Sequence, residues 1–281
     1  MEPTLLEQKR LAKHIIAVVA GKGGVGKSAV TVNLALALQK KGYFVGILDA
    51  DLYGPSLQKM LPMEEMPQEY ERKKNSLLPA IGSGIKMISM AYFRAKNEAS
   101  MVRAPIANAL ITQFLHNVHW GDLDYLLLDF PPGTGDIQLT ILQETILSGA
   151  IIVTTPQEVA LLDVHKATQM LEKMHVPILG VVENMSYFSD PKTQEKHFVF
   201  GKGGGRRFAE ERGLPFLGEI PIDPQLSLCL DEGKSIFESY PNSISASSFL
   251  SLLDIMQEHL IAMKTQVGNI VSDFELIWKD M

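Results

Sequence analysis

The sequence predicts an α/β fold in which a doubly wound, mostly parallel sheet is flanked by helices. Short apolar runs rich in leucine and β-branched residues alternate with stretches of helical spacing. Continuous apolar runs indicate strands buried on both faces, as in a parallel sheet covered by helices. The expected strands are His14–Ala20, Phe44–Asp49, Ile85–Met90, Tyr125–Asp129, Ala150–Thr154, Ile178–Asn184 and Phe216–Ile220. The expected helices are Ser28–Lys40, Pro105–Asn117, Ile137–Leu147, Leu162–Met174 and Gly204–Glu211.

Length and composition limit the class of protein. A chain of 281 residues suits one large domain over residues 1–281, which includes a short leader at residues 1–13, in preference to two small domains. The formal net charge of −6 gives no general attraction to nucleic acid. No apolar run is long enough to cross a bilayer, and the acidic and polar start of the chain is unlike a signal peptide. We therefore expect a cytoplasmic protein with neither nucleic acid nor a membrane as its partner.

A glycine-rich loop follows the first expected strand and opens the first expected helix. Its glycines let backbone N–H groups turn toward a polyphosphate, and the helix N-terminus adds positive potential at the same place. Lys27 can reach the β- and γ-phosphates, and the Ser28 hydroxyl can bind Mg²⁺. The sequence therefore predicts a nucleotide-binding loop made of Gly21, Lys22, Gly23, Gly24, Val25, Gly26, Lys27 and Ser28.

The second lysine of this loop, Lys22, stands where the common phosphate-loop pattern needs no charge. With it, the loop resembles the deviant Walker A loop of the ParA/MinD/nitrogenase iron protein class of ATPases. In that class the extra lysine crosses a dimer interface to the partner's nucleotide. The resemblance implies a homodimer closed over nucleotide, in which Lys22 and Lys27 both serve catalysis.

Two carboxylates end the second expected strand. Asp49 and Asp51 lie at its carboxyl end, next to the glycine-rich loop, where ligands bind in sheets of this kind. Phosphoryl transfer depends on positioning and charge neutralisation, so Asp49 is predicted to support Mg²⁺ and its waters. Asp51 is predicted to orient the attacking water. The alternative is that both carboxylates only cap a helix or turn.

Asp129 ends the fourth expected strand, the usual place for a carboxylate that holds Mg²⁺ through water. The next loop combines two stiff prolines, Pro131 and Pro132, with two permissive glycines, Gly133 and Gly135. This composition suits a loop with a few discrete settings that can sense a γ-phosphate. We interpret it as a switch loop, with a purely structural turn as the alternative.

A base pocket is predicted from two later positions. Asn184 ends a late strand, and its side-chain amide can both donate to and accept from an adenine edge. Pro221, after the next strand, is a candidate for the other wall of that pocket. Asparagine at a strand end is equally common as a turn former, and that alternative stays open.

Two further segments complete the chain. Residues 60–84 lack clear periodicity and are interpreted as an insertion within the single domain. Spacing over residues 245–264 predicts an amphipathic helix packed on the body, and residues 270–278 predict a second such helix before the end of the chain at residue 281. The charges flanking the second helix are mostly acidic, which favours packing within the chain or a dimer over docking onto anionic lipid.

Several longer stretches resemble the Mrp/ApbC (Nbp-type) iron–sulfur cluster carrier ATPases, within the ParA/MinD class. The sequences Asp-Leu-Tyr-Gly-Pro-Ser at 51–56 and Pro-Pro-Gly-Thr-Gly-Asp at 131–136 are more typical of this branch than of ParA or MinD. The resemblance covers most of residues 13–230. It implies a P-loop ATPase fold of the MinD/ParA type, ATP and Mg²⁺ as cofactors, and a cluster bridged between two subunits and delivered to apoproteins.

The chain departs from that family at one point. The family places a Cys-x-x-Cys pair just after Asn-Met-Ser-Tyr-Phe, whereas Asp190 and Thr193 stand at those positions here. Iron–sulfur clusters are held mainly by thiolates, and oxygen ligands substitute poorly for them. Cys229 is the only cysteine in the sequence and lies among leucines, which is typical of core packing. The sequence therefore identifies no iron–sulfur ligand.

The resemblance implies a Mg²⁺-dependent ATPase that works as a homodimer and carries iron–sulfur clusters to apoproteins. The alternative, from a different class, is a nucleotide-switched adaptor of the ParA/MinD type. Such an adaptor uses dimerisation to recruit a protein or a surface, and slow hydrolysis serves only as its timer. Anaerobic reconstitution with iron and sulfide distinguishes the two.

Overall fold

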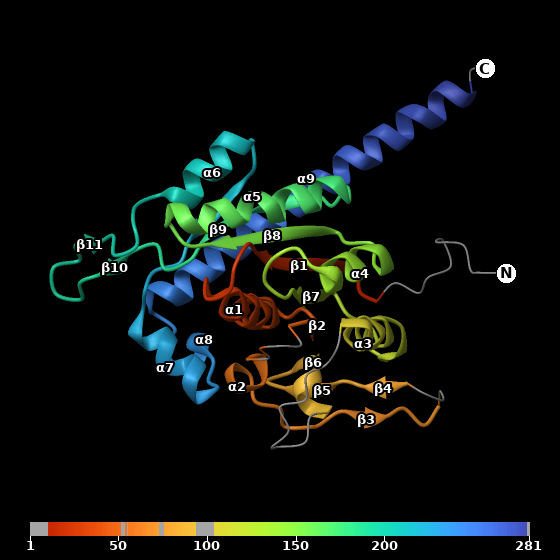
Figure 1. The fold of residues 1–281 in the computed structure, drawn as a ribbon, viewed down its shortest axis with the longest axis horizontal. Coiled ribbons are helices and arrows are strands. Elements are labelled where there is room, and N and C mark those ends of the chain that lie inside the picture. Colours follow the sequence, from red (N-terminus) through yellow and green to blue (C-terminus); the bar gives the residue numbers. More distant parts are fainter. Residues whose placement is uncertain (1–10, 52–53, 55, 73–75, 94–103, 280–281) are drawn as a thin grey trace.

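The computed structural model describes residues 11–51, 54, 56–72, 76–93 and 104–279, and for residues 266–279 it describes the helix but not the side chains. Within these residues the main sheet has eight strands in the order β12-β9-β8-β1-β7-β2-β6-β5. All neighbouring strands are parallel except β5 and β6, which are antiparallel. Most of these strands follow one another down Figure 1. Their bounds are β1 His14–Ala20, β2 Val45–Asp49, β5 Ala80–Gly82, β6 Ile85–Ser89, β7 Tyr125–Asp129, β8 Gly149–Thr154, β9 Ile178–Glu183 and β12 Phe216–Glu219.

Helices cover both faces of this sheet. Their bounds are α1 Lys27–Lys40, α2 Leu57–Met60, α3 Ala104–Asn117, α4 Asp136–Glu144, α5 Glu158–Lys173, α6 Gly204–Arg212, α7 Pro224–Glu232, α8 Ile236–Ser239 and α9 Ile244–Lys279, with a 3-10 turn η1 at Met90–Phe93. Two small hairpins stand outside the main sheet in Figure 1: β3 Gln68–Glu69 with β4 Leu77–Leu78, and β10 Phe188–Ser189 with β11 Lys196–His197.

The core is divided by the sheet into two layers. Along β1, Ile16 and Val18 face one apolar cluster together with side chains of α1, α7, α8 and α9. Ile15 and Ala17 face the other, with side chains of α3, α4, α5 and α6. Alternate residues of a strand point to opposite faces, so a strand that is apolar throughout buries both faces. The predicted doubly wound fold is confirmed.

The strand order places the candidate ligand residues together. β1 lies between β8 and β7, and the chain returns from β1 through α1 to β2 on the far side of β7. The order therefore changes direction at β1, and open α/β sheets bind ligands beside the carboxyl ends of strands at such a point. The glycine-rich loop and Asp49, Asp51 and Asp129 follow or end β1, β2 and β7 at this edge.

Some predicted elements differ from the observed ones. The sequence predicts two C-terminal helices, whereas α9 is one continuous helix to Lys279 that extends past the body in Figure 1. A single internal glycine, Gly268, costs only about 1 kcal/mol and does not end a helix. The predicted apolar face at residues 270–278 lies outside the described side chains. Helix α5 begins at Glu158 rather than Leu162, and α4 ends at Glu144 rather than Leu147.

The sequence also missed short elements. Helices α2 and α8 and both small hairpins are too short to give a clear period, and helix α7, which is as long as α4 and α6, was also missed. Residues 60–84, interpreted as an insertion, hold β3, β4 and β5. Strand β5 extends the main sheet at its edge, where Ile81 also pairs with Glu65. Residues 1–10 of the expected leader lie outside the described residues. No helix in the described part of the chain is both long and apolar enough to span a membrane.

Candidate functional site

The glycine-rich loop takes the conformation that its glycines allow. Gly24 and Gly26 have φ angles of 83° and 82°, in the left-handed region that side chains disfavour. Gly26 is also the residue before α1, so the loop turns there and delivers Lys27 as the first helical residue. The free N–H groups of the first turn of α1 are therefore placed at the loop, which is the geometry that binds phosphate.

Two neighbours hold the loop closely. A Cβ atom on Gly21 would lie 2.2 Å from the backbone carbon of Asp163 in α5, so only glycine fits there. A Cβ atom on Gly26 would lie 2.1 Å from the side-chain nitrogen of Asn184. That same Asn184 nitrogen donates to the Val25 carbonyl at 2.9 Å. The loop is thus buttressed on one side by a helix backbone and on the other by the residue that follows β9.

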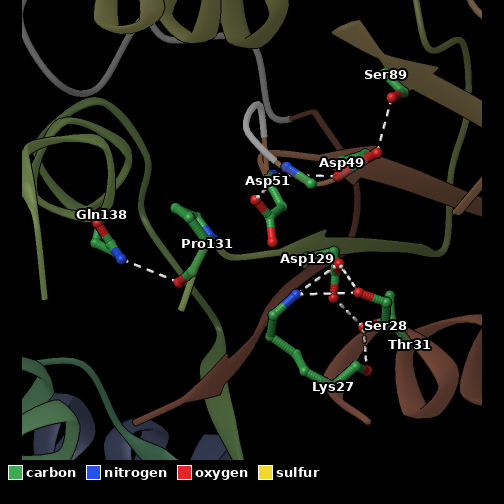
Figure 2. A network of polar contacts seen from close by, with 10 residues as sticks. Lys27, Ser28, Thr31, Asp49, Asp51, Ser89, Asp129, Pro131 and Gln138 are labelled. Atoms are coloured by element: carbon green, nitrogen blue, oxygen red, sulfur yellow. Dashed lines mark hydrogen bonds and ion pairs between the residues drawn. The ribbon is translucent and has the colours of Figure 1, made fainter. Parts of the chain in front are cut away.

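Asp129 is the centre of the polar network at the loop (Figure 2). Its carboxylate is fully buried and accepts from the Lys27 ammonium at 2.7 Å and from the Ser28 hydroxyl at 2.7 Å through one oxygen. The Thr31 hydroxyl donates to the other oxygen at 2.6 Å. A buried charge is tolerated only when it is paired and hydrogen-bonded, and Asp129 meets both conditions. The structure thus brings the predicted residues Lys27, Ser28 and Asp129 together.

Asp49 is the neighbour of Asp129 in strand register and is equally buried. The Ser89 hydroxyl donates to one of its oxygens at 2.7 Å, and the Asp51 N–H donates to the other at 3.1 Å. Burial, followed by the nearby negative charge of Asp129, raises the pKa of Asp49 to about 7. The ordinary pKa of an aspartate is 3.8. Two buried carboxylates are thus adjacent at this site, and among the described residues only Asp129 forms an ion pair.

Tyr92, in the turn after β6, faces the same environment. Its buried hydroxyl has no hydrogen-bond partner among the residues that the structure describes, and burial together with the charge of Asp49 raises the pKa of Tyr92 above its ordinary value. Asp51 stands farther out, half-buried, and accepts from the Gly54 N–H at 3.2 Å. This contact is the turn cap that was the alternative interpretation for Asp51.

The predicted switch loop is held at three points. Gly133, at a φ of 88°, donates its N–H to the carbonyl of Ala20 at 3.2 Å, directly before the glycine-rich loop. The side chain of Gln138 donates to the carbonyls of Pro131 and Pro132 at 3.0 and 3.2 Å and accepts from the Gly135 N–H at 2.9 Å. Figure 2 shows the Gln138 side chain pointing at Pro131.

The remaining predicted residues lie around this site. Lys22 is half-buried, and Gly23 beside it is exposed. Pro221 is buried after β12, next to Ile222, whose N–H donates to the carbonyl of Tyr187 at 2.7 Å. A role for Asn184 and Pro221 in an adenine pocket stays a prediction, although Asn184 certainly contacts the phosphate-binding loop.

The segment that carries Asp190 and Thr193 is the hairpin of β10 and β11. One oxygen of the Asp190 carboxylate accepts from the N–H groups of Lys192 and Thr193 at 2.8 and 2.9 Å, which closes the turn between the strands. These bonds hold the pKa of Asp190 below its ordinary value. Asp190 is half-buried and Thr193 is exposed. Asp190 therefore builds a turn, and its backbone partners occupy one of its two oxygens.

Cys229 lies elsewhere in the fold. It is a buried free cysteine on α7 and packs in the core layer that contains α1 and α9. Burial raises the pKa of the Cys229 thiol. The described residues hold no group of three or more His, Cys, Asp or Glu side chains arranged to bind a metal ion. At the positions where the family resemblance implies a Cys-x-x-Cys pair, Asp190 and Thr193 offer oxygen atoms in place of thiolates.

Sequence reasoning missed four polar residues of this region. Thr31 and Ser89 support Asp129 and Asp49, and Gln138 holds the switch loop. Glu183 is fully buried and accepts from the Ser186 hydroxyl at 2.5 Å and the Gly205 N–H at 2.6 Å, so it ties together the two ends of the segment that carries the hairpin. The sequence signal that could have pointed to such a residue is a polar side chain next to an apolar run, as Glu183 is directly after Val181-Val182.

Comparison with known proteins decides the family. A family model described as "ParA: NUBPL iron-transfer P-loop NTPase" matches residues 11–257. The chain belongs to this family of iron-transfer P-loop NTPases. A relative from Pyrococcus horikoshii named "Iron-sulfur cluster carrier protein" is 42% identical over 277 residues, which cover 95% of this chain and 94% of that protein. A second, from Arabidopsis thaliana, is named "Iron-sulfur protein required for NADH dehydrogenase, mitochondrial" and is 45% identical, covering 92% of this chain and 82% of its own length.

Solved structures of similar fold agree with this family assignment. A nucleotide-binding protein in complex with ADP from Archaeoglobus fulgidus is 37% identical, with a TM-score of 0.69, covering 84% of this chain and 95% of its own. The cell division ATPase MinD from Pyrococcus furiosus, at 22% identity and a TM-score of 0.62 over 88% of this chain and 99% of its own, shows the same fold. The predicted resemblance to iron–sulfur cluster carrier ATPases and the MinD/ParA type of P-loop fold are both confirmed.

Proposed function

We propose that this iron-transfer P-loop NTPase binds ATP with Mg²⁺, hydrolyses it slowly, and works as a homodimer that closes over the nucleotide. The observation that carries the proposal is the network around Asp129. One buried carboxylate collects the lysine, the serine and a threonine from the start of α1, all beside a loop with phosphate-binding geometry. Such an arrangement positions charge and hydroxyls at the place where a triphosphate and its cation meet.

Each predicted residue has a role in this proposal. Lys27 binds the β- and γ-phosphates, and its ion pair with Asp129 orients the ammonium toward the loop. Ser28, Asp49 and Asp129 offer hard oxygen atoms, the ligand type that Mg²⁺ prefers, either directly or through water. Mg²⁺ bound there supplies charge neutralisation for phosphoryl transfer. Asp51, farther out than Asp49, orients the attacking water.

A ligand that binds at Asp129 must displace hydrogen bonds that this carboxylate already accepts. Its two oxygens already accept three hydrogen bonds. A ligand that recruits Lys27 or Ser28 replaces those bonds rather than adding to them, so its net gain per contact is smaller than the strength of the new bond. The N–H groups of the loop and of the first turn of α1 therefore supply the main attraction for the phosphates.

In the proposed dimer, Lys22 of one subunit completes the nucleotide site of the other. This lysine is half-buried in the loop and lies between the packed Gly21 and the exposed Gly23. An ammonium at this place can extend away from its own phosphate loop toward a second subunit. The homodimer is supported by the resemblance to the ParA/MinD class and by no contact within this single chain.

The cargo of the proposed dimer is an iron–sulfur cluster for apoproteins, the activity for which the relatives are named. In the β10–β11 hairpin of this chain, a carboxylate oxygen of Asp190 closes the turn at the place where the family resemblance implies a pair of thiolates. That hairpin favours the second candidate function, a nucleotide-switched adaptor that recruits a protein. Anaerobic reconstitution with iron and sulfide separates the two: a stoichiometric absorbing cluster supports the carrier, and ATP-dependent dimerisation without a cluster supports the adaptor.

The Lys22→Ala variant tests the dimeric ATPase. We expect it to bind ADP as the parent chain does but to lose ATP-dependent dimerisation in light scattering, and with it hydrolysis. The matched control is Lys40→Ala, an exposed lysine at the far end of α1. Asp51→Ala should still bind ATP and hydrolyse it far more slowly. Parent-like dimerisation and turnover in Lys22→Ala would remove the cross-subunit role, and a parent chain that takes up no MgATP would remove the whole proposal.

A further inference from the structure

We infer that Gln138 is a positioning residue that holds the switch loop in the setting required for ATP hydrolysis. This inference rests on the proposed ATPase function. Gln138 lies on the first turn of α4, directly after the loop, and is 3% exposed. Burying a polar amide is costly unless its hydrogen bonds are made, so its presence inside the protein needs a reason.

The Gln138 side chain uses both of its polar ends on one loop. Its nitrogen donates to the Pro131 carbonyl at 3.0 Å and to the Pro132 carbonyl at 3.2 Å. Its oxygen accepts from the Gly135 N–H at 2.9 Å. Pro131 is buried, so its carbonyl needs a donor, and the following Pro132 has no N–H to contribute to the turn. Gln138 is therefore a clamp that joins the start and the end of the switch loop.

The middle of the same loop is joined to the phosphate-binding loop. Gly133 donates its N–H to the carbonyl of Ala20, the last residue of β1, at 3.2 Å. The loop also begins one residue after Asp129, which holds Lys27 and Ser28. A movement of Lys27 or Ser28 that accompanies phosphate binding is thereby transmitted through Asp129 to a loop whose two ends are fixed to each other by Gln138.

Two properties of the clamp make it specific. The carbonyls of Pro131 and Pro132 accept hydrogen bonds and the Gly135 N–H donates one, so a side chain that meets all three needs a donor and an acceptor at its end, as the glutamine amide has. Glutamate has the same shape but would place a carboxylate oxygen against two carbonyl oxygens. Leucine keeps the volume and removes every bond.

The test compares Gln138→Glu and Gln138→Leu with the parent chain and with Gln143→Glu. Gln143 is an exposed glutamine on the same helix, so its variant adds the same charge without touching the loop. Steady-state hydrolysis of MgATP gives kcat and KM, calorimetry gives the affinity for ADP, and a thermal melt reports folding. Hydrogen exchange of the peptide covering residues 130–137 reports the loop without any reference to activity.

We expect both Gln138 variants to lose at least about tenfold in kcat, while KM and ADP affinity change less than about threefold, because misplacement of a positioned group acts on the transition state. Exchange at residues 130–137 should speed up only in these variants, and Gln143→Glu should match the parent. Parent-like kcat in folded Gln138 variants overturns the inference. So does a joint fall of kcat, ADP affinity and melting temperature, which marks a purely structural role. A parent chain without ATPase activity instead removes the proposed function itself.

Discussion

The pKa of Asp49 makes the stability of this protein depend on pH in a way that one substitution removes. Burial and the neighbouring Asp129 raise this pKa from 3.8 to about 7. The folded state therefore holds a proton that the unfolded chain releases between those pH values. Stability falls as the pH rises through this window, because the cost of ionising Asp49 inside the protein grows until the folded pKa is passed.

The magnitude follows from the two pKa values. The cost of ionising Asp49 is about 2 kcal/mol at pH 5 and about 4 kcal/mol at pH 8, a difference of about 2–3 kcal/mol. The Asp49→Asn variant has no such proton, so its free energy of unfolding should lack this part of the pH dependence. The difference between the parent and Asp49→Asn should thus change by about 2–3 kcal/mol from pH 5 to pH 8, in favour of the variant at the higher pH.

Urea unfolding at several pH values between 5 and 8, without nucleotide or Mg²⁺, measures this difference. The Asp231→Asn variant is the control, since Asp231 is exposed on α7 and its replacement should leave the pH dependence of the parent intact. Parallel pH profiles for the parent and Asp49→Asn would refute the reasoning, because they would show that Asp49 ionises alike in the folded and unfolded chain.

Two further predictions concern the supports of the site. Gly26→Ala should weaken ADP binding strongly while leaving the chain folded, because the new Cβ atom would lie 2.1 Å from the Asn184 amide and the backbone φ at this position is 82°. Calorimetry measures the affinity for ADP, and an unchanged affinity would contradict the proposed loop geometry. Glu183→Gln should lower the free energy of unfolding by about 1–3 kcal/mol, because the new NH₂ group cannot accept a hydrogen bond from the donor that it faces, Ser186 or Gly205. A parent-like denaturant midpoint would show that this buried carboxylate contributes nothing to stability.

The fold and the phosphate loop could be predicted because their signals are local. Eight consecutive residues carry the loop, and the apolar runs of the central strands are continuous. Asp49 and Asp129 could be placed because each ends such a run, and parallel strands bring their carboxyl ends to one edge. Asp129 is paired with Asp49 across β2 and β7, as this argument expects.

The supporting residues could not be predicted, because their contacts are distant in the sequence. Thr31 stands four residues after Lys27 on an apolar helix and meets Asp129, 98 positions away. Ser89 meets Asp49 across 40 positions. Asn184 was interpreted from its chemistry as a base contact, which stays a prediction, and its hydrogen bond from the amide nitrogen to the Val25 carbonyl of the loop was not foreseen. A side chain with several possible partners can be assigned only when the fold shows which partner is near.

The two buried aspartates explain each other. Asp129 accepts hydrogen bonds from Lys27, Ser28 and Thr31, and burial followed by the negative charge of Asp129 raises the pKa of its neighbour Asp49. Both side chains are acidic, so neither can neutralise the other. In the proposed complex Lys27 also contacts the phosphate, so it is no longer available to Asp129 alone. In the proposed complex, a divalent cation next to the pair would supply the positive charge that both carboxylates need while Lys27 turns to the nucleotide. The proposal therefore predicts that Mg²⁺ and nucleotide bind more tightly together than either does alone.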